Sequence, residues 1–360
     1  MMTAKIINVL MLGDSLTQSG GIATLQKLII KYAPPDLKID QIATRDEGSG
    51  FKKGIVFLRA IYLLIWRLLS QQTDVIHIHI ADGGSILRKA ILATIAFSFR
   101  KPVLMHAHGA VFHLNYENSP KFIQQLMRRV FSQCKGWIAL TSFWQDFYIS
   151  SLGLDAKQVF ILLNPTELPP TIPHRINSTT VKLVFVGRIG QRKGTFDLIE
   201  AFAKLPEHLR TSVELFIAGD GEIEKATQLT QDLHLTEQIT FLGLINASAR
   251  DLLLETADVY ILPTYNEGLP LALLEAMSWG LPVITTPVSG IPDVVKDRQN
   301  GLIVEAGDIQ QLADAIQLSI ENEDLRITLG RAARETVGKL DMKSFSSRLA
   351  EIYRTVSEYN

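Results

Sequence analysis

Cysteine is almost absent from this sequence, because Cys134 is the only one among 360 residues. A single thiol cannot form an internal disulfide, and it cannot build a CxxC pair or a cysteine-rich zinc cluster. The sequence therefore excludes the class of small disulfide-stapled domains. We expect a protein of the reducing cytoplasm.

Long apolar runs are absent as well. The two most apolar stretches, 60–66 and 90–99, are bracketed by Lys or Arg residues, and both are shorter than the roughly 18 residues that a membrane-spanning helix needs. The opening MMTAKIINVLMLGD lacks a basic segment followed by an apolar core. We therefore expect neither a transmembrane segment nor a signal peptide.

A third missing pattern is the Gly-x-Gly-x-x-Gly turn of a nicotinamide-dependent dehydrogenase, since AGDGEIEKA (218–226) has no third glycine. There is no low-complexity tract, and 47% apolar with 20% charged residues is typical of a globular chain. A chain of this length predicts two domains of roughly 150 to 200 residues each.

The net charge of −1 conceals two unlike halves. Residues 1–165 contain 18 Lys+Arg and 10 Asp+Glu, whereas residues 166–360 contain 18 and 27. A basic half joined to an acidic half indicates that the first half meets an anionic surface or substrate. Chance variation of the surface charge is the alternative.

Short apolar runs alternate with helical patterns in both halves, which predicts parallel sheets with crossover helices. The expected strands are 6–12, 75–80, 102–109, 136–141 and 159–164, then 181–187, 213–219, 238–243, 258–263, 282–286 and 301–304. The Pro-rich segment NPTELPPTIPHRINSTT (164–180), which also contains Asn177, discourages regular structure. We expect domains at 1–165 and 181–340, a linker at 166–180, and a C-terminal helix (341–360) that packs back on the first domain.

Ligands of open α/β sheets bind beyond the carboxyl ends of strands, so the loops that follow strands are the candidate site. Gly20 and Gly21 precede a helix and would let a phosphate approach the backbone, although simple turn chemistry explains them as well. The loop GRIGQRKG places Arg188 and Lys193 after a strand. These cations suit the two phosphates of a nucleotide diphosphate, or else they form a solvated basic loop.

The stretch 264–295 is the most informative one. Glu267 ends a strand loop, Pro270 suits the first turn of a helix, and Glu275 lies inside that helix. The amide groups from Gly268 to Leu271 can bind phosphate. Glu275 needs a hydrogen-bond donor as a partner, which a ribose diol would supply, and a structural carboxylate bonded to backbone amides is the alternative.

Glu267 and Glu275 form an E-x7-E motif inside EGLPLALLEAMSWGLPVI, preceded by the Arg-x4-Lys of GRIGQRKG. In these motifs the chain resembles the retaining glycosyltransferase family 4, the group 1 glycosyltransferases. The resemblance covers essentially the whole chain and is most specific over 183–304, where it includes AGDGE, FLG and SGIPD. In the first half it rests on the GGI of 20–22 and the HAHG of 106–109.

This resemblance implies the α/β GT-B fold, in which two Rossmann-like doubly wound domains face each other across a cleft, an acceptor-side domain first and a nucleotide-sugar-binding domain second. It implies transfer of a sugar from a nucleotide diphosphate donor to a hydroxyl acceptor, with retention of configuration and without a protein nucleophile. Two catalytic positions are implied, His108 near C6 of the sugar and Glu267. The implied donor-binding residues are Gly20, Gly21, Arg188, Lys193, Gly268, Leu269, Leu271 and Glu275.

Family members lack the paired carboxylates that hold Mg²⁺ in other glycosyltransferases, and this sequence has no DxD. We expect no metal and no cofactor beyond the donor substrate. The expected partners are the donor and a glycan or lipid-linked acceptor of envelope or exopolysaccharide synthesis, with no nucleic acid. One departure is Asn164-Pro165-Thr166-Glu167, where many members have Asn-Gly at the hinge, so proline should stiffen that joint.

The segment FKKGIVFLRAIYLLIWRLL (51–69) combines Lys and Arg with a wide apolar surface. It either rests on anionic lipid at the inner face of the plasma membrane or forms a core helix whose Arg side chains reach water. Two other functions remain open. A nucleotide-sugar epimerase could share two such domains, and a non-catalytic sugar-binding protein could retain the fold.

Overall fold

The protein is described from a computed structural model covering residues 6–18, 20–173, 175 and 180–358. The chain divides into two compact units, residues 1–165 with 342–360 and residues 166–341. The opening residues 1–5, and Asn177 with most of its neighbours in the expected linker, lie outside the described residues.

Unit 1 is built on a parallel sheet with the strand order β2-β1-β3-β4-β5-β6. Its strands are β1 (Ile7–Asp14), β2 (Leu37–Arg45), β3 (Val75–Ile80), β4 (Val103–Ala107), β5 (Gly136–Ala139) and β6 (Val159–Ile161). Its helices are α1 (Gly21–Lys31), α2 (Gly50–Leu69), α3 (Gly84–Ser98), α4 (Phe112–Glu117), α5 (Lys121–Phe131), α6 (Ser142–Leu152) and α14 (Met342–Ser357), with the 3-10 turn η1 (Ala156–Gln158).

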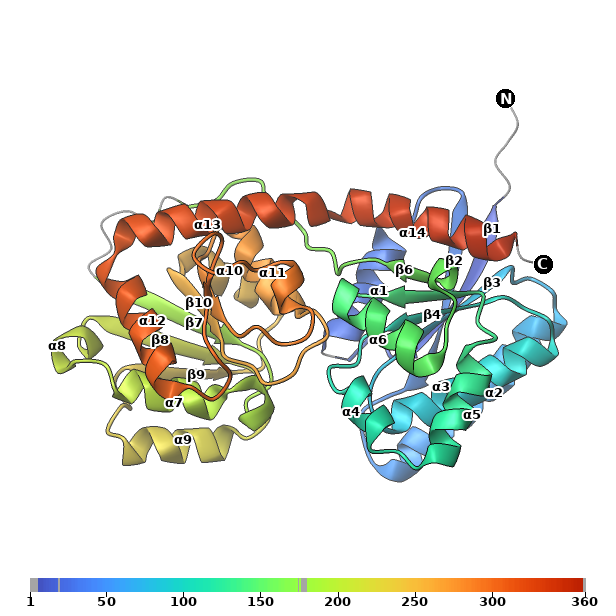
Figure 1. The fold of residues 1–360 in the computed structure, drawn as a ribbon, viewed down its shortest axis with the longest axis horizontal. Coiled ribbons are helices and arrows are strands. Elements are labelled where there is room, and N and C mark those ends of the chain that lie inside the picture. Colours follow the sequence, from blue (N-terminus) through green and yellow to red (C-terminus); the bar gives the residue numbers. More distant parts are fainter. Residues whose placement is uncertain (1–5, 19, 174, 176–179, 359–360) are drawn as a thin grey trace. The chain divides into compact units, whose positions relative to one another are not determined.

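Helices cover both faces of this sheet, as the near-continuous apolar strands require. Figure 1 shows α3 and α5 on one side of the sheet and α14 along the other. α14 buries Phe345, Leu349, Ile352 and Val356, which recur at helical spacing. It contacts β3 and β4, the two central strands. The last helix of the chain is therefore part of the core of the unit that the first residues build.

Helix α2 has two unlike faces. It begins at Ser49, whose hydroxyl accepts the N–H of Lys52 at 3.3 Å. One face buries Ala60, Leu64 and Leu68 and contacts β2, and Arg67 pairs with Asp40. The other face exposes large apolar side chains at helical spacing, namely Phe51, Ile55, Leu58, Tyr62, Trp66 and Leu69. Among the described residues, no helix combines the length and the apolar character that crossing a membrane requires.

Unit 2 is built on a second parallel sheet, with the order β12-β11-β10-β7-β8-β9. Its strands are β7 (Val181–Val186), β8 (Val213–Ala218), β9 (Ile239–Gly243), β10 (Val259–Leu262), β11 (Val283–Thr285) and β12 (Leu302–Ile303). Its helices are α7 (Thr195–Ala203), α8 (Glu207–Arg210), α9 (Ile223–Asp232), α10 (Ala247–Thr256), α11 (Leu271–Ser278), α12 (Ile309–Glu321) and α13 (Glu323–Val337), with 3-10 turns η2 (Gln191–Lys193), η3 (Ile291–Asp293) and η4 (Gly338–Leu340).

Arg175 anchors part of the segment expected as a linker. Its guanidinium donates to the carbonyl oxygens of Leu254, Glu255 and Ala257 at the end of α10 and to that of Trp279 at the end of α11. These carbonyls have no partner within their own helices, so a cation satisfies them. The segment is irregular, as expected, but at Arg175 it is bound to unit 2.

Lys89 of α3 is a buried cation in unit 1. Its ammonium donates to the hydroxyl of Thr44 and lies 3.4 Å from the carbonyl oxygen of Leu12. Burial lowers the pKa of Lys89 to about 7, although the nearby Asp14 opposes the shift. The charged form of this side chain is therefore costly in the folded state.

We expect Lys89→Met to be stabilising relative to the wild type at about pH 7 and to lose that advantage by about pH 10. Lys89 has a pKa of about 7 in the folded chain and about 10.4 in the unfolded chain. As the pH rises from one value to the other, the free energy of unfolding of the wild type therefore increases by roughly 1.4 kcal/mol per pH unit. Urea unfolding at several pH values measures the difference in free energy of unfolding between Lys89→Met and the wild type. The exposed Lys27 on α1 is the control, and a difference that does not change with pH would contradict the prediction.

Candidate functional site

The site residues of unit 2 cluster where its strand order reverses. β7 and β10 are neighbours, yet the chain continues from β7 to β8 on one side and from β10 to β11 on the other. Loops that follow two such strands diverge and leave room for a ligand beyond their carboxyl ends. Lys193 follows β7 and Glu267 follows β10, so both belong to this switch point.

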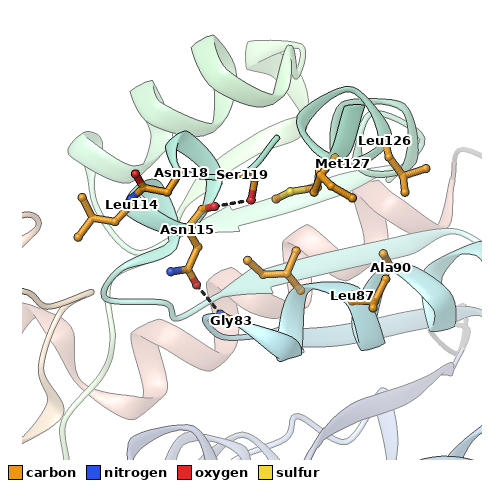
Figure 2. Close-up of a pocket in the computed structure, with 11 residues that line it drawn as sticks. Gly83, Leu87, Ala90, Leu114, Asn115, Asn118, Ser119, Leu126 and Met127 are labelled. Atoms are coloured by element: carbon orange, nitrogen blue, oxygen red, sulfur yellow. Dashed lines mark hydrogen bonds between the residues drawn. The ribbon is translucent and has the colours of Figure 1, made fainter. Parts of the chain in front are cut away.

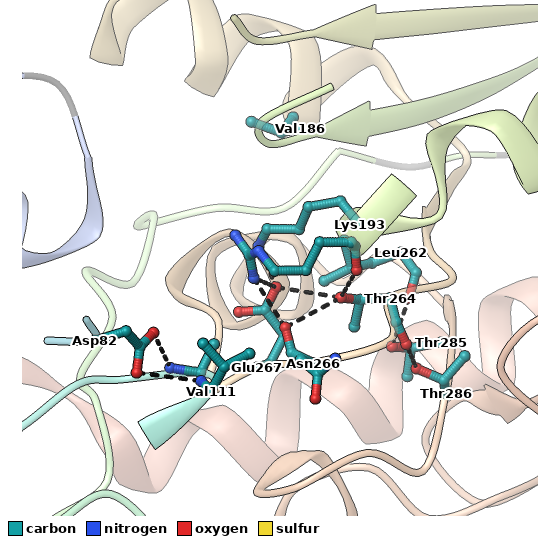
Figure 3. Close-up of polar contacts among 12 residues, drawn as sticks. Asp82, Val111, Val186, Lys193, Leu262, Thr264, Asn266, Glu267, Thr285 and Thr286 are labelled. Carbon is teal, nitrogen blue, oxygen red and sulfur yellow. Dashed lines mark hydrogen bonds and ion pairs between the residues drawn. The ribbon is translucent and has the colours of Figure 1, made fainter. Parts of the chain in front are cut away.

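Glu267 and Lys193 form a nearly buried ion pair (Figure 3). Their side chains are 8% and 14% exposed. Arg192 lies 3.5 Å from the same carboxylate oxygen, and the hydroxyl of Thr264 lies 3.4 Å from it. Two cations therefore surround one carboxylate at the edge of the sheet, and a buried carboxylate needs such compensation.

The two loops are also joined through their backbones. The carbonyl oxygen of Arg192 accepts from the Thr264 hydroxyl and from the Tyr265 amide, both at 2.9 Å, and the Arg192 guanidinium donates to the Asn266 carbonyl at 2.8 Å. Gly194, at φ +70°, approaches so closely that an added Cβ would lie 2.0 Å from the Pro263 carbonyl oxygen. Only glycine allows this contact.

Helix α11 begins immediately after this loop. Gly268 and Leu269 are buried, Pro270 precedes the first helical residue, and the first turn begins at Leu271. The amides of such a turn present partial positive charge, which favours an anion.

Glu275, in the second turn of α11, already has a partner. The guanidinium of Arg250 on α10 donates to its carboxylate at 2.6 Å and also binds Asp251. Burial raises the pKa of Glu275, while Arg250 opposes the shift. A ribose diol is thus not needed to satisfy this carboxylate, and a ligand there would share it with Arg250.

Arg188 makes its contact with a residue other than Lys193 or Glu267. Its guanidinium is 3.7 Å from the Asp220 carboxylate in the loop after β8, and its side chain is 70% exposed. Of the cations expected from the sequence, the structure brings Lys193 against Glu267 and leaves Arg188 extended at the surface. An exposed pair of this kind is weakly held, so the side chain is free to turn.

In unit 1, His108 follows β4 and is positioned by a contact with His79. Its Nε2 is 2.9 Å from Nδ1 of the buried His79 on β3, which leaves Nδ1 as the ring nitrogen not engaged by His79. Burial lowers the pKa of His108 to about 3, so the ring is neutral near pH 7. The carboxylate of Asp82 accepts the N–H groups of Ala110 and Val111 and fixes the loop that follows.

Gly109 lets Asp82 reach this loop, because an added Cβ would lie 2.1 Å from the Asp82 carboxylate. Gly20 and Gly21 lie exposed at the start of α1, where Gly20 has φ +134° and open space around the position of a Cβ. The backbone of Gly20 and Gly21 is therefore accessible.

Unit 1 also contains an apolar pocket of about 490 Å³ (Figure 2). It lies among α3, α4 and α5 and is lined by Ile86, Leu87, Leu114, Leu126 and Met127, with Asn115 and Ser119 among its polar residues. Asn115 accepts the N–H of Gly83 through its side chain at 2.6 Å, and its carbonyl accepts the Ser119 hydroxyl. The pocket therefore has apolar walls and a hydrogen-bonded polar part.

Sequence reasoning missed four residues that hold the expected ones in place, namely His79, Asp82, Arg192 and Arg250. Arg192 stands beside Lys193 in the motif, so its position was the available signal. The others contact partners that are 25 or more positions away in the sequence, as the pairs His79–His108, Asp82–Ala110 and Arg250–Glu275 do. No spacing rule finds such contacts.

The comparisons with known proteins agree with one another. The family described as "Glycosyl transferases group 1" matches residues 172–336. A phosphatidyl-myo-inositol mannosyltransferase of Mycobacterium leprae is 28% identical, over 86% of this chain and 81% of its own. A UDP-Gal:alpha-D-GlcNAc-diphosphoundecaprenol alpha-1,3-galactosyltransferase of Escherichia coli is 25% identical, over 82% and 79%.

Among solved structures, HepE of Anabaena in complex with UDP and glucose has a TM-score of 0.76 to this chain. The match covers 96% of this chain and 98% of HepE at 18% identity. At that identity the likeness shows the fold, and it spans both units.

We expect Lys193→Met and Glu267→Gln to be coupled by about 2 kcal/mol in a double-mutant cycle. Each single change leaves a charged or polar group without its main partner in a nearly buried place, and the double change removes that penalty. Urea unfolding of the full chain measures the cycle. The exposed pair Glu222–Lys225 should give a coupling of no more than about 0.5 kcal/mol, and equal couplings for both pairs would contradict the assignment.

Proposed function

We propose that this chain, which matches the group 1 glycosyl transferases over residues 172–336 and has the GT-B fold, is a retaining, metal-independent glycosyltransferase. In this proposal a sugar passes from a nucleotide diphosphate donor to a hydroxyl acceptor. Unit 2 binds the donor, and unit 1 serves the acceptor side.

One observation carries the proposal. At the switch point of unit 2, the loop after β7 supplies cations and is bonded to the loop after β10, which carries Glu267 and leads into α11 with Glu275. Cations and helix amides suit a diphosphate, and carboxylates suit sugar hydroxyls. This combination of groups is what a nucleotide-sugar donor requires.

The proposed reaction breaks the bond between C1 of the sugar and the diphosphate oxygen and forms a bond from C1 to the acceptor oxygen. The acceptor proton passes to the leaving diphosphate. Lys193, Arg188 and the amides from Gly268 to Leu271 stabilise the negative charge that grows on that diphosphate, which is the role that Mg²⁺ fills elsewhere.

The ion pair of Lys193 with Glu267 has a consequence for donor binding. Before the donor binds, Glu267 neutralises the ammonium of Lys193. A diphosphate would attract Lys193 and Arg192 and leave the Glu267 carboxylate available for a sugar hydroxyl. Binding of the two halves of the donor is thus coupled through one side chain.

The proposal assigns roles to further positions of each unit. Gly20 and Gly21 offer accessible backbone in unit 1, Leu269 and Leu271 line the start of α11, and Glu275 shares its carboxylate between Arg250 and the ribose. His108 is assigned to the sugar near its reacting centre through Nδ1, the nitrogen that His79 leaves available.

We assign a lipid-linked glycan acceptor, of the kind used in envelope or polysaccharide synthesis. Two relatives are described as acting on phosphatidyl-myo-inositol and on a diphosphoundecaprenol. The apolar pocket lined by Leu87, Leu114 and Leu126 suits the hydrocarbon part of such an acceptor (Figure 2).

The exposed apolar face of α2 supports a membrane partner. Phe51, Leu58 and Trp66 are 81%, 67% and 55% exposed on one side of the helix, and Lys52 and Lys53 stand beside them. An interfacial helix has this composition, with apolar groups that enter the lipid and cations that attract anionic head groups. We propose that unit 1 rests on the inner face of the plasma membrane.

We expect one nucleotide among UDP, GDP, ADP and dTDP, offered with its sugars in EDTA, to raise the unfolding temperature of the wild type. UDP is the first to test, because HepE is described with UDP and glucose. Lys193→Met should reduce the shift because it removes a cation that binds the diphosphate. Glu275→Gln should reduce it because it weakens the contact with the ribose. A loss of about 1.4 kcal/mol in binding is tenfold in affinity.

Lys204→Met and Glu255→Gln change exposed residues of the same unit and should leave the shift intact. Addition of Mg²⁺ should leave it intact too. A donor site elsewhere is indicated if the control variants and the site variants respond alike, and a requirement for Mg²⁺ would overturn the metal-independent mechanism.

We expect the wild type to sediment with vesicles of phosphatidylglycerol and phosphatidylcholine at low salt, and less so as salt screens the attraction. Leu58→Glu should release it, because a carboxylate on the apolar face opposes both insertion and anionic lipid. Leu252→Glu alters an equally exposed leucine of unit 2 and should still sediment. Protein that stays in the supernatant at low salt would rule out this surface.

A further inference from the structure

Three buried histidines lie side by side on the central strands of unit 1. His77 and His79 are two residues apart on β3, so they share one face of the sheet, and His79 lies opposite His106 on β4. All three are at most 2% exposed. One ring nitrogen from each lies within 4.8 Å of those of the other two.

Several of these nitrogens lack a partner. Within the described part of the chain, Nε2 of His77, Nε2 of His79 and both nitrogens of His106 are buried without a hydrogen bond. An unpaired buried polar group is costly, and native proteins rarely leave several together unless an ion or a water completes them. A neutral imidazole carries a lone pair that such an ion can use.

The Nδ1 atoms of His77 and His79 have the kind of hydrogen-bond partner that the second nitrogen of a metal-binding histidine has. Nδ1 of His77 is 2.7 Å from the hydroxyl of Tyr353 on α14, and Nδ1 of His79 is 2.9 Å from Nε2 of His108. A proton on each Nδ1 leaves the lone pair on Nε2, the unpaired atom. Hydrogen bonds of this second nitrogen orient the ring and fix its tautomer in metal sites.

We propose that His77, His79 and His106 bind a divalent transition metal ion of the zinc type in the core of unit 1. Three imidazoles and no carboxylate form a donor set that suits Zn²⁺, Ni²⁺ or Cu²⁺, whereas Mg²⁺ and Ca²⁺ prefer oxygen. Zn–N bonds of about 2.0–2.1 Å place ligand nitrogens roughly 3.3 Å apart in a tetrahedron, so the rings close around the ion.

The ion has a structural role that is separate from sugar transfer. It joins β3 to β4, and through Tyr353 its ligand His77 contacts the C-terminal helix α14. Because the ligands are fully buried, the ion enters as unit 1 folds. This inference does not rest on the proposed function, and the metal independence proposed for the transfer concerns the diphosphate in unit 2.

Ring packing by itself is the competing explanation. The rings of His77 and His106 stack at 5.4 Å with an angle of 8°, and those of His79 and His108 at 5.1 Å with an angle of 6°. Stacking accounts for the neighbouring rings. It does not account for the four nitrogens without partners, which phenylalanine side chains at these positions would not have introduced.

The test uses the full chain without a histidine tag, produced in zinc-supplemented medium and, in parallel, unfolded and refolded with Co²⁺. We expect one tightly held ion per chain by elemental analysis, and visible absorption bands of nitrogen-ligated tetrahedral cobalt. His106→Gln should lose the ion. Tyr353→Phe should weaken its affinity roughly 10- to 100-fold, because it removes only the orienting hydrogen bond.

His208→Gln, which changes an exposed histidine of unit 2, should retain the ion. Wild-type protein with no bound metal after both treatments would overturn the proposal, and so would an unchanged metal content in His106→Gln. If that variant does not fold, the cobalt spectrum of the wild type decides, because ring packing alone produces no such bands.

Discussion

The carboxylate of Glu267 imposes the constraint on which the organisation of unit 2 depends. A nearly buried anion is stable only beside cations, and here both cations come from the loop after the neighbouring strand. The loops after β7 and β10 are therefore held together by charge as well as by the backbone contacts of Arg192. The carboxylate to which we assign a role in sugar binding thus also holds together the two loops that carry it.

Unit 1 uses the same principle at the corresponding edge of its sheet. Lys89 donates to groups at the ends of β1 and β2, and Asp82, which follows β3, accepts amides from the loop after β4. Each charged group is shielded from water and forms hydrogen bonds with neighbouring backbone or hydroxyl groups. Asp82 consequently positions the loop after β4, whereas Lys89 links β1 to β2 at a cost in desolvation.

Most strands of the two sheets could be predicted because strand runs and helical spacing are local properties of the chain, but β2 (Leu37–Arg45), which is only partly buried, was missed. The sequence also placed Lys193 and Glu267 in loops that follow strands, but their pairing depends on β7 and β10 being neighbours in the sheet, which the sequence pattern does not give. Arg250 and Asp82 could not be found in this way, because each meets its partner through tertiary packing. Which face of α2 is exposed could not be predicted either, because periodicity separates two apolar faces without telling which one meets water.

The chain leaves unit 1 at residue 165 and returns to it at residue 342, so unit 2 is inserted within unit 1. On a ribosome, residues 166–341 emerge in full before α14 exists. Unit 2 can complete its core while the central strands of unit 1 still lack the cover of Phe345, Leu349 and Tyr353. β3 and β4 thus wait for their helical cover while all of unit 2 is synthesised, a period in which their apolar surface is open to chaperones or to aggregation.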